Sequence, residues 1–320
     1  MTAVLGIDVA KAKCDVTLQF PDGRRRRKVV PNTAVGLRTL IAWLPQQGAG
    51  LVHAGLEATG TYGDLFATGL HDAGHVVSLL NPATIHAYGQ ATLTRTKTDR
   101  ADADLIATYL ATQQPAAWTP PAREVRELQA LVRRLDALLT MQTQEKNRLA
   151  AGALVPAVQQ SIETILAGLT AEIAAVRRLI ADHIDRHPGL RTQRDLLASI
   201  PGIGETTAAI LLGDLLAKSF GSARQAAAFA GLVPRIVESG TWKGRTRLSK
   251  LGSGRLRKAL YLPALAALRY NPSIRALRTR LEQHGKPPMV IVGAAMRKLI
   301  HLAYGVLRSQ RPYDATWVRA

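Results

Sequence analysis

The sequence predicts an α/β unit followed by two mainly helical regions, in a chain of 320 residues. Three observations lead to this class. Strand-like and helix-like segments alternate up to the prolines Pro115, Pro120 and Pro121. Beyond them, apolar residues recur at helical spacing, and positive charge then gathers in the last part of the chain. A chain of this length is expected to form more than one domain. We therefore predict three regions, residues 1–117, 118–190 and 191–320.

The first region begins with three predicted strands. Residues 3–9 form an apolar run that is typical of a buried strand. Residues 14–20 alternate between apolar and polar and end at Pro21-Asp22-Gly23, which is a hairpin turn signal. Residues 26–30 would form the third strand, antiparallel to the second.

Helices and strands then alternate to the end of this region. Asn32 and Thr33 can cap a helix that runs to about Leu44. The later segments are a strand at 51–57, a helix at 61–73, a strand at 76–80 that stops at Asn81-Pro82, and a helix at 98–112. The predicted order is therefore βββ-α-β-α-β-α.

The second region has the apolar spacing of two long helices. Val125, Leu128, Val132, Leu135 and Leu139 follow each other at three and four residues, as do Ile162, Leu166, Leu169, Ile173, Val176 and Ile180. This is the a/d pattern of a coiled coil. The helices could pair as an antiparallel hairpin, dimerise, or form an ordinary core pair; the few aromatic residues favour the extended hairpin. His183 and His187 are expected at its surface, because the sequence offers no third metal ligand nearby.

The third region is predicted to be mainly helical, with helices near 193–199, 204–216, 222–230, 253–268, 272–284 and 289–308. The first two helices are joined by Ile200-Pro201-Gly202-Ile203-Gly204, which resembles a helix-hairpin-helix turn. Its glycines allow close backbone approach, and the N-terminus of the following helix offers free N–H groups to a phosphate. The alternative is a plain glycine-containing turn.

Positive charge is concentrated in this third region. The chain has 42 Lys and Arg against 23 Asp and Glu, a formal net charge of +19. Residues 235–311 alone hold 17 basic and 2 acidic residues, which gives 17 − 2 = +15. This balance favours a polyanionic partner over a small metabolite, with a solvated surface as the alternative. The candidate nucleic-acid-binding residues are Gly202, Gly204, Lys243, Arg245, Arg247, Lys250, Arg255, Arg257 and Lys258. For the shorter run at 24–28, a solvated hairpin and a nucleic-acid contact are equally open.

Composition excludes several other classes. Cys14 is the single cysteine, so neither an internal disulfide framework nor a cysteine-rich zinc site is expected. No apolar run reaches the roughly 18 residues of a spanning helix. The N-terminus lacks the charged and apolar segments of a signal peptide. We therefore expect a cytoplasmic protein that does not enter a membrane.

Four acidic residues are candidates for one metal site. Asp8 interrupts the apolar run Val4–Val9, where a carboxylate is costly unless it is paired or bound to a metal. Glu57 ends a later strand, and Asp99 and Asp102 share one helix face, although such a pair is most often solvated. If the four converge, they need cations, and two Mg²⁺ ions can clamp a phosphodiester for in-line displacement. This arrangement, with the βββαβα order, suits the RNase H-like nucleases.

Ser239 is the candidate nucleophile. It lies in Glu238-Ser239-Gly240, ahead of a dense basic stretch that runs to Lys258. Taken alone, it is an ordinary loop serine. Guanidinium groups nearby could hold a scissile phosphate and stabilise the developing charge. No histidine lies close in sequence to act as a base, so its activation must come from elsewhere.

Together these motifs resemble those of the DEDD transposases of the Piv-invertase type, insertion-sequence recombinases that include bridge-RNA-guided members. The resemblance runs from about residue 4 to residue 314. Its motifs are Gly6–Lys11, Glu57–Tyr62, Lys97–Ala103, Ser199–Gly204, Phe229–Pro234, Glu238–Gly240 and Leu256–Leu260. Their order and separation make the combined pattern specific, although each motif is short.

The resemblance implies a RuvC-like nuclease domain, a coiled-coil hairpin and a transposase domain with a catalytic serine. By motif, Asp8, Glu57, Asp99 and Asp102 would bind Mg²⁺, with Mn²⁺ as a substitute, while Asp104 lies off the pattern. Ser239 would form a 5′-phosphoserine bond and leave a 3′-hydroxyl, and strands would exchange through a junction.

The same resemblance implies the partners. These are donor and target DNA, a structured noncoding guide RNA, and further copies of the chain. The assembly would be a dimer to a tetramer, in which the tetrad of one protomer completes the serine site of another. The protein would act in the bacterial cytoplasm, on the nucleoid. Trp242 would stack on a base or fill a core.

Three alternatives remain open at this point. The first is a metal-dependent Holliday-junction resolvase without a covalent intermediate, for which the four carboxylates suffice. The second is a protein-only DNA invertase. The third is a non-enzymatic nucleic-acid-binding scaffold derived from a transposase.

Overall fold

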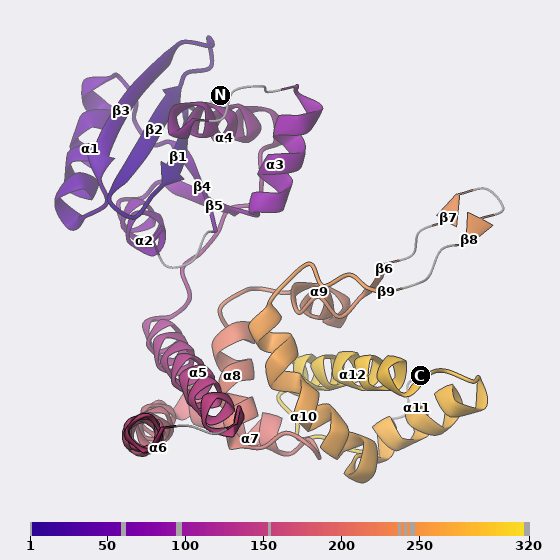
Figure 1. Cartoon of the computed structure of the whole chain (residues 1–320). Helices are drawn as coiled ribbons and strands as arrows, with labels where there is room; N and C mark the ends of the chain where they lie inside the picture. Colours follow the sequence, from indigo (N-terminus) through magenta and orange to yellow (C-terminus); the bar gives the residue numbers. More distant parts are fainter. Residues whose placement is uncertain are drawn as a thin grey trace. The chain divides into compact units, whose positions relative to one another are not determined.

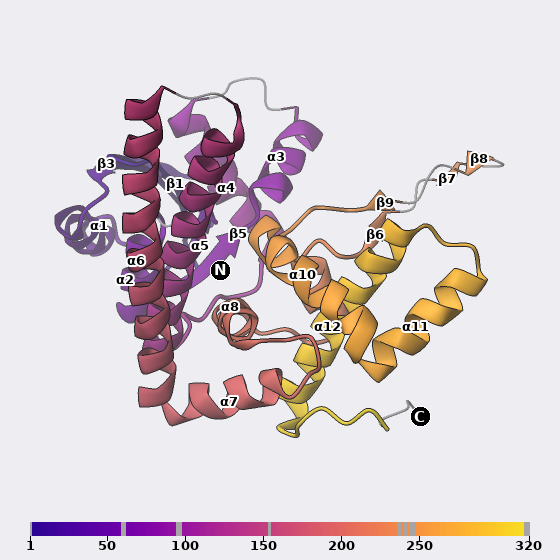
Figure 2. The same cartoon turned by 60° about the horizontal axis from the view of Figure 1, so that its bottom comes forward.

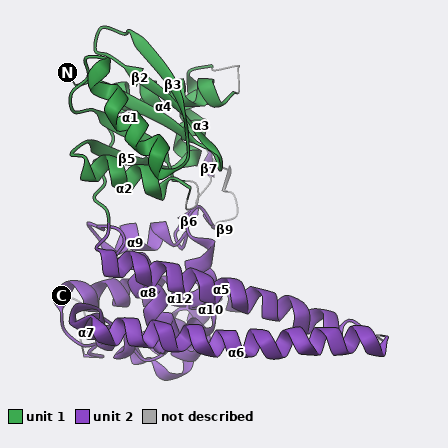
Figure 3. Cartoon of the chain, turned by 90° about the vertical axis from the view of Figure 1, so that its left-hand side faces the viewer, with its two compact units in different colours: residues 1–120 green, residues 121–320 purple. Residues whose placement is uncertain are grey.

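The structure of the chain is a computed structural model, which divides into two compact units, residues 1–120 and 121–320 (Figure 3). Each unit has its own hydrophobic core. The boundary falls between Pro120 and Pro121. The structure describes residues 2–58, 62–93, 98–152, 155–235, 238–239, 242–243 and 247–316.

Unit 1 is built on a five-stranded mixed sheet in the order β3-β2-β1-β4-β5 (Figure 1). The first three strands in sequence pair antiparallel, and β1, β4 and β5 run parallel. Every strand predicted for this region is present, with ends that differ by at most two residues. The strands are β1 (Val4–Val9), β2 (Lys13–Gln19), β3 (Arg25–Pro31), β4 (His53–Glu57) and β5 (Val76–Leu80).

Helices cover both faces of this sheet. The buried side chains of α1 (Ala34–Gln46) and α2 (Asp64–Asp72) share one core cluster with Leu5 and Ile7 of β1. Helix α4 (Asp99–Gln113) packs against β1, β2 and β4, and its buried residues cluster with Val4. Because side chains alternate along a strand, Val4, Gly6 and Asp8 all face α4. The predicted helix cap is confirmed, since the Thr33 hydroxyl accepts a hydrogen bond from the Gly36 N–H at 3.2 Å.

Helix α3 (Pro82–Ala91) was not predicted. The sequence predicts only the end of a strand at Asn81-Pro82, whereas in the structure these residues also begin a helix. The Asn81 side chain accepts a hydrogen bond from the Ala83 N–H at 2.9 Å, and Pro82 occupies the first turn. Both residue types are favoured at these positions, so the signal was present in the sequence.

Unit 2 contains the predicted helical hairpin, α5 (Arg123–Ala150) and α6 (Pro156–Arg186), whose helices pack along each other (Figures 2 and 3). The predicted core positions Val125 to Leu135 on α5, and Ile162, Ile173, Val176 and Ile180 on α6, are buried. On α6, the predicted Leu166 and Leu169 are only partly buried. Near the end of the α5 pattern, however, Leu138 is buried and the predicted Leu139 only partly so. An α-helix has 3.6 residues per turn, so a strict three-and-four pattern drifts around its surface.

His183 on α6 is buried, not at the surface as predicted. Its side chain is 5% exposed, and its Nε2 atom lies 2.8 Å from the carbonyl oxygen of Glu124 on α5. The histidine therefore joins the two helices of the hairpin by a polar contact.

Every helix predicted for the third region is present, and these helices share one core with α5 and α6. Four short strands between α9 and α10 were not predicted; β6 (Pro234–Arg235) pairs with β9 (Arg247–Leu248), and β7 (Glu238–Ser239) with β8 (Trp242–Lys243). Two-residue strands are too short to give a periodic signal. The helices are α7 (Pro188–Ala198), α8 (Glu205–Leu215), α9 (Ala223–Phe229), α10 (Gly254–Tyr270), α11 (Pro272–Gln283) and α12 (Pro288–Ser309).

Helix α12 has the length and mean hydropathy of a membrane-spanning helix, which the sequence analysis did not expect anywhere. Half of its apolar window is buried inside unit 2, where it packs against α9 and α10. Arg297 and Lys298 also lie near its middle. These features are those of a core helix.

Candidate active site

The position of Asp8 depends on a glycine two residues before it. Gly6 faces α4, and a Cβ atom there would lie 2.5 Å from the Ala107 backbone nitrogen and still closer to the Ala103 carbonyl oxygen. Only glycine allows this approach between strand and helix. It brings the first turn of α4 against the end of β1, where Asp8 lies half-buried.

Glu57 is placed beside Asp8 by the parallel pairing of β1 and β4. The register aligns Ile7 with Leu56, so Glu57 lies next to Asp8 at the same edge of the sheet. Gly55 faces α4 as Gly6 does, because a Cβ there would lie 2.7 Å from a methyl carbon of Leu110. Glu57, two residues further on, therefore points to the α4 side as well.

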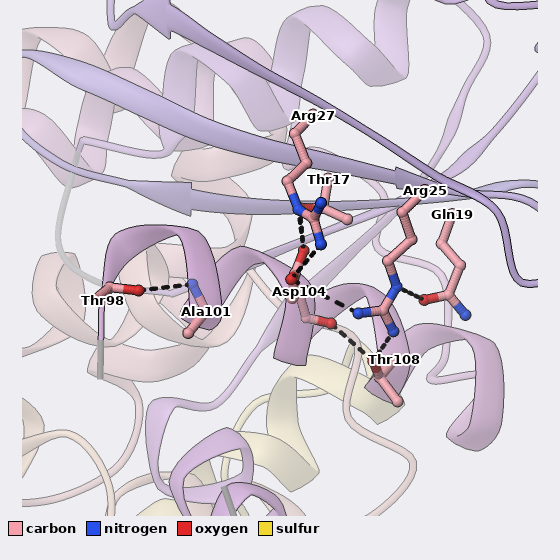
Figure 4. Close-up of polar contacts among 8 residues, drawn as sticks. All are labelled: Thr17, Gln19, Arg25, Arg27, Thr98, Ala101, Asp104 and Thr108. Carbon is pink, nitrogen blue, oxygen red and sulfur yellow. Dashed lines mark hydrogen bonds and ion pairs between the residues drawn. The ribbon is translucent and has the colours of Figure 1, made fainter. Parts of the chain in front are cut away.

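Asp99 and Asp102 occupy the first turn of α4. The Thr98 hydroxyl caps this helix by accepting a hydrogen bond from the Ala101 N–H at 3.2 Å (Figure 4). The positive end of the helix dipole stabilises carboxylates in this turn. The sequence predicted both residues on one face of a helix, and the helix begins at the first of them.

The electrostatics of Asp8 indicate that the charges of the other three carboxylates reach it. Burial, followed by the negative charges of Asp102, Asp99, Glu57 and Asp15, raises the pKa of Asp8 from 3.8 to about 6. A carboxyl group with several like charges around it ionises less readily. Such clusters are characteristic of functional sites.

Two residues that the sequence analysis did not select complete this region. Asp15 on β2 lies directly opposite Asp8 and is 9% exposed. The Lys13 ammonium lies 2.9 Å from a carboxylate oxygen of Asp15 and 2.9 Å from one of Asp99. Its hydrogen bond lowers the pKa of Asp99. Like Asp8, Asp15 is a carboxylate inside an apolar strand, and the sequence pattern that indicated Asp8 therefore also indicates Asp15.

Cys14, next to Asp15 on β2, faces the other side of the sheet and is buried among apolar residues. Burial, followed by the charges of Asp8 and Asp15, raises the pKa of its thiol to about 12. The thiol therefore stays protonated at neutral pH and is not a nucleophile.

Asp104, which lies off the family pattern, has a different environment (Figure 4). Its carboxylate accepts hydrogen bonds from the Thr17 hydroxyl at 2.7 Å and from Arg27 at 2.8 and 3.0 Å. Burial opposes its ionisation, but the bonds from Arg27 and Thr17 lower its pKa overall. Arg25 donates to the Thr108 hydroxyl at 2.9 Å. Part of the basic run at 24–28 therefore joins β3 to α4.

The donor atoms of the candidate tetrad fit a divalent metal. Carboxylate oxygens are the ligands that Mg²⁺ and Mn²⁺ prefer. The raised pKa of Asp8 marks an excess of negative charge that a cation would relieve. Within the described ranges, no three His, Cys, Asp or Glu side chains lie close enough together to hold a metal ion as they stand. Metal binding would therefore bring the side chains closer.

Ser239 lies on the exposed strand β7 of unit 2, paired with Trp242 of β8. In the same strand register, its neighbour Glu238 lies opposite Lys243. Arg245 and the side chain of Lys243, both candidate nucleic-acid contacts, lie outside the described residues. The tetrad belongs to unit 1 and the serine to unit 2.

Three of the candidate nucleic-acid-binding residues have partners within unit 2. Arg255 forms an ion pair with Asp214, which is 4% exposed. Arg257 donates to the Ala230 carbonyl oxygen at 3.1 Å. The Lys258 ammonium lies 3.0 Å from a carboxylate oxygen of Asp136 on α5. These contacts hold α10 in place, so a nucleic acid would have to compete for these side chains.

The other candidates differ in their exposure. Gly202 has a φ of +105° and packs against α10, where a Cβ would lie 2.8 Å from that of Ala267. A glycine is therefore needed at position 202 for this packing. Gly204, Arg247 and Lys250 are exposed. Gly204 precedes the first turn of α8, and that turn carries Glu205, which already supplies a negative charge there.

The mixed sheet with its acidic edge and the basic helical unit are features of an enzyme that acts on DNA, and comparison with known proteins establishes this class. Residues 5–155 match the transposase family DEDD_Tnp_IS110. Residues 194–278 match the transposase IS116/IS110/IS902 family. The protein is therefore a DNA recombinase of the transposase class, and it belongs to the IS110 family.

Two of its relatives match nearly the whole chain. It is 33% identical to the pilin gene-inverting protein of Moraxella bovis over 318 residues, which cover 97% of each chain. The pilin gene-inverting protein of Moraxella lacunata is 32% identical over the same share. The uncharacterized 42 kDa protein of insertion element IS900 from Mycobacterium paratuberculosis is 31% identical over 51% of this chain and 42% of that protein. Membership in a DEDD family also indicates the use of a divalent metal.

Proposed function

We propose that the protein is the site-specific recombinase of a mobile element, with Ser239 as nucleophile and Asp8, Glu57, Asp99 and Asp102 as the ligands of Mg²⁺. The observation that carries this proposal is the electrostatic environment of Asp8, which is half-buried and surrounded by the other three carboxylates. Like charges held near one another oppose folding, so a function in binding cations is favoured.

In the proposed cleavage, the Ser239 hydroxyl oxygen attacks a phosphorus atom of the DNA strand. The bond from phosphorus to the 3′ oxygen breaks, which gives a 5′-phosphoserine and a 3′-hydroxyl. The serine proton passes to a carboxylate of the tetrad, and the 3′ oxygen takes up a proton. When bound, Mg²⁺ supplies charge stabilisation at the phosphate. Strands then exchange through a junction.

The serine and the tetrad lie in different compact units, and we propose that they meet between copies of the chain. In a dimer or tetramer, the tetrad of one protomer completes the serine site of another. This arrangement supplies Ser239 with the base that its own sequence neighbourhood lacks. Strand β7 is exposed, which keeps the serine accessible to such a partner.

A structured noncoding guide RNA is the proposed source of target choice, in the bacterial cytoplasm where donor and target DNA are found. The 17 basic residues against 2 acidic ones in residues 235–311 support a large phosphate-binding surface. When base pairing selects the target, the protein needs to recognise only backbone and shape. Exposed Arg247 and Lys250 suit such contacts.

A protein-only DNA invertase is the second candidate. It is favoured by the 97% coverage shared with the pilin gene-inverting proteins, whose names describe DNA inversion. Sequencing the nucleic acid that co-purifies with the protein, expressed together with its flanking DNA, separates the two. One discrete RNA from the flank supports guidance, whereas heterogeneous RNA or none supports the invertase.

The mechanism is tested by recombination in a plasmid carrying donor and target sites. Ser239→Ala should abolish both recombination and the protein–DNA adduct seen after denaturing electrophoresis, because no other atom forms that bond. Asp8→Asn should reduce recombination by roughly 100-fold or more, as expected for loss of a catalytic metal ligand. Ser161→Ala, at an exposed serine of α6, is the matched control. Full recombination by Ser239→Ala with loss in Asp8→Asn would instead indicate a resolvase that hydrolyses DNA directly.

A further inference from the structure

Lys13 is a cationic side chain that lies against the candidate metal site. It begins β2, and its ammonium nitrogen is 2.9 Å from Asp15 and 2.9 Å from Asp99. These carboxylates belong to different elements, β2 and the first turn of α4. One ammonium therefore bridges the sheet and the helix at the edge where the four carboxylates gather.

The bridge uses one of the proposed metal ligands. Asp99 offers the same carboxylate to Lys13 that it would offer to a metal ion. Asp15 is buried opposite Asp8, so it faces the same edge of the sheet. The positive charge of Lys13 thus offsets part of the repulsion within the cluster, as a metal ion would.

We propose that Lys13 is a positioning residue that competes with the divalent metal for Asp99. Without metal, its ammonium holds the start of α4 to β2. When metal binds, Asp99 exchanges the ammonium for the ion, and Lys13 keeps Asp15 as its partner. This inference rests on the proposed function in one respect, the role of Asp99 as a metal ligand.

The exposure of the pair supports an exchangeable contact. The Lys13 side chain is 46% exposed and that of Asp99 is 54% exposed, whereas Asp15 is 12% exposed. Exposed ion pairs are weak and give way readily. A divalent ion carries twice the charge and so attracts a carboxylate more strongly at equal distance. The exposed partner is therefore the one that exchanges.

The test is the affinity of the full-length protein for Mn²⁺, measured by electron paramagnetic resonance of the free ion. Removing the competitor in Lys13→Met should tighten binding by roughly twofold to fivefold, the range expected for loss of one partly exposed charge contact. Lys13→Gln should behave alike, and Lys13→Arg, which keeps the charge, should match the unmodified protein. Lys11→Met removes the same charge from a described residue that forms no ion pair with any other described residue, and should change the affinity less than twofold.

The controls separate this inference from the proposed function. If Asp99→Asn weakens Mn²⁺ binding but Lys13→Met and Lys13→Gln bind as Lys11→Met does, or more weakly, Lys13 is not a competitor and the inference is overturned. If the unmodified protein binds no more Mn²⁺ than Asp8→Asn and Asp99→Asn do, the tetrad is not a metal site, and both proposals fail. Circular dichroism melting establishes that each variant is folded.

Discussion

The interface between α4 and the sheet holds charged side chains of two kinds. Around Asp8, burial and then the charges of Asp102, Asp99, Glu57 and Asp15 oppose its ionisation and raise its pKa. At Asp104, further along α4, Arg27 and Thr17 surround a carboxylate and lower its pKa. Asp8 and Asp104 both lie partly buried at this interface. The contrast indicates that a carboxylate with hydrogen-bond partners joins the elements, whereas the like charges around Asp8 make that region the candidate cation site.

A change that separates α4 from the sheet should break both arrangements. Gly6→Ala places a methyl group against the backbone of Ala103 and Ala107, and overpacking of this kind costs about 1–3 kcal/mol. We expect loss of recombination together with faster hydrogen–deuterium exchange over residues 99–113. Gly50→Ala, where an added methyl group meets nothing within 4 Å, is the control. Unchanged exchange in Gly6→Ala would contradict the close approach.

Removing the Asp104 carboxylate, which has hydrogen-bond partners, should lower the stability of the protein. Asp104→Ala leaves Arg27 and Thr17 without their partner, at a cost of about 1–3 kcal/mol. The pKa of Asp104 is lowered on folding, so its contribution is present above the unfolded value of 3.8 and is lost as pH falls through the lower folded value. Hydrogen exchange of α4 at pH 7 measures the effect, with exposed Asp72→Ala as the control. Equal exchange in the two variants would show that the Asp104 contacts add nothing.

Removing the Asp8 carboxylate should raise the stability of the metal-free protein, the opposite of the effect expected at Asp104. Folding raises the pKa of Asp8 to about 6, so its ionisation disfavours the folded state increasingly as pH rises from about 4 to above 6. Asp8→Asn should therefore stabilise the metal-free protein by about 1 kcal/mol at pH 7.5, a figure reduced for the solvent around this half-exposed group. Thermal melting at pH 7.5 and pH 4.5 tests this, since the gain should shrink at the lower pH. Asp182→Asn on α6 serves as the reference, and destabilisation at pH 7.5 would refute the repulsive cluster.

Much of the fold was predictable because it depends on local patterns. Apolar runs, alternation and turn residues located the strands of the sheet, and helical spacing located α5, α6 and the helices after them. Helix α3 was missed because Asn81-Pro82 serves two elements, and the short strands around Ser239 because they have no periodicity. The candidate tetrad came from motif resemblance combined with Asp8 in an apolar strand. Asp15, by the same physical reasoning, was available and overlooked.

The nucleic-acid-binding residues were harder to predict. Counting charges cannot tell a free cation from one that is paired with a distant residue. Arg255 pairs with Asp214, 41 residues earlier, and Lys258 with Asp136, 122 residues earlier. Such partners become visible only when the helices are packed. Arg247 and Lys250, by contrast, are exposed, and their role in binding stays a prediction.

The contacts of Asp104 with β2 and β3 have a consequence for how this segment tolerates change. They fix the rotational phase of α4 about its own axis, and Asp99 and Asp102 take their directions from that phase. Inserting or deleting one residue between Asp99 and Asp104 would turn the first turn by about 100° relative to the rest of the helix. Substitutions at the intervening solvent-facing positions should therefore be accepted in this stretch, while changes of its length should not.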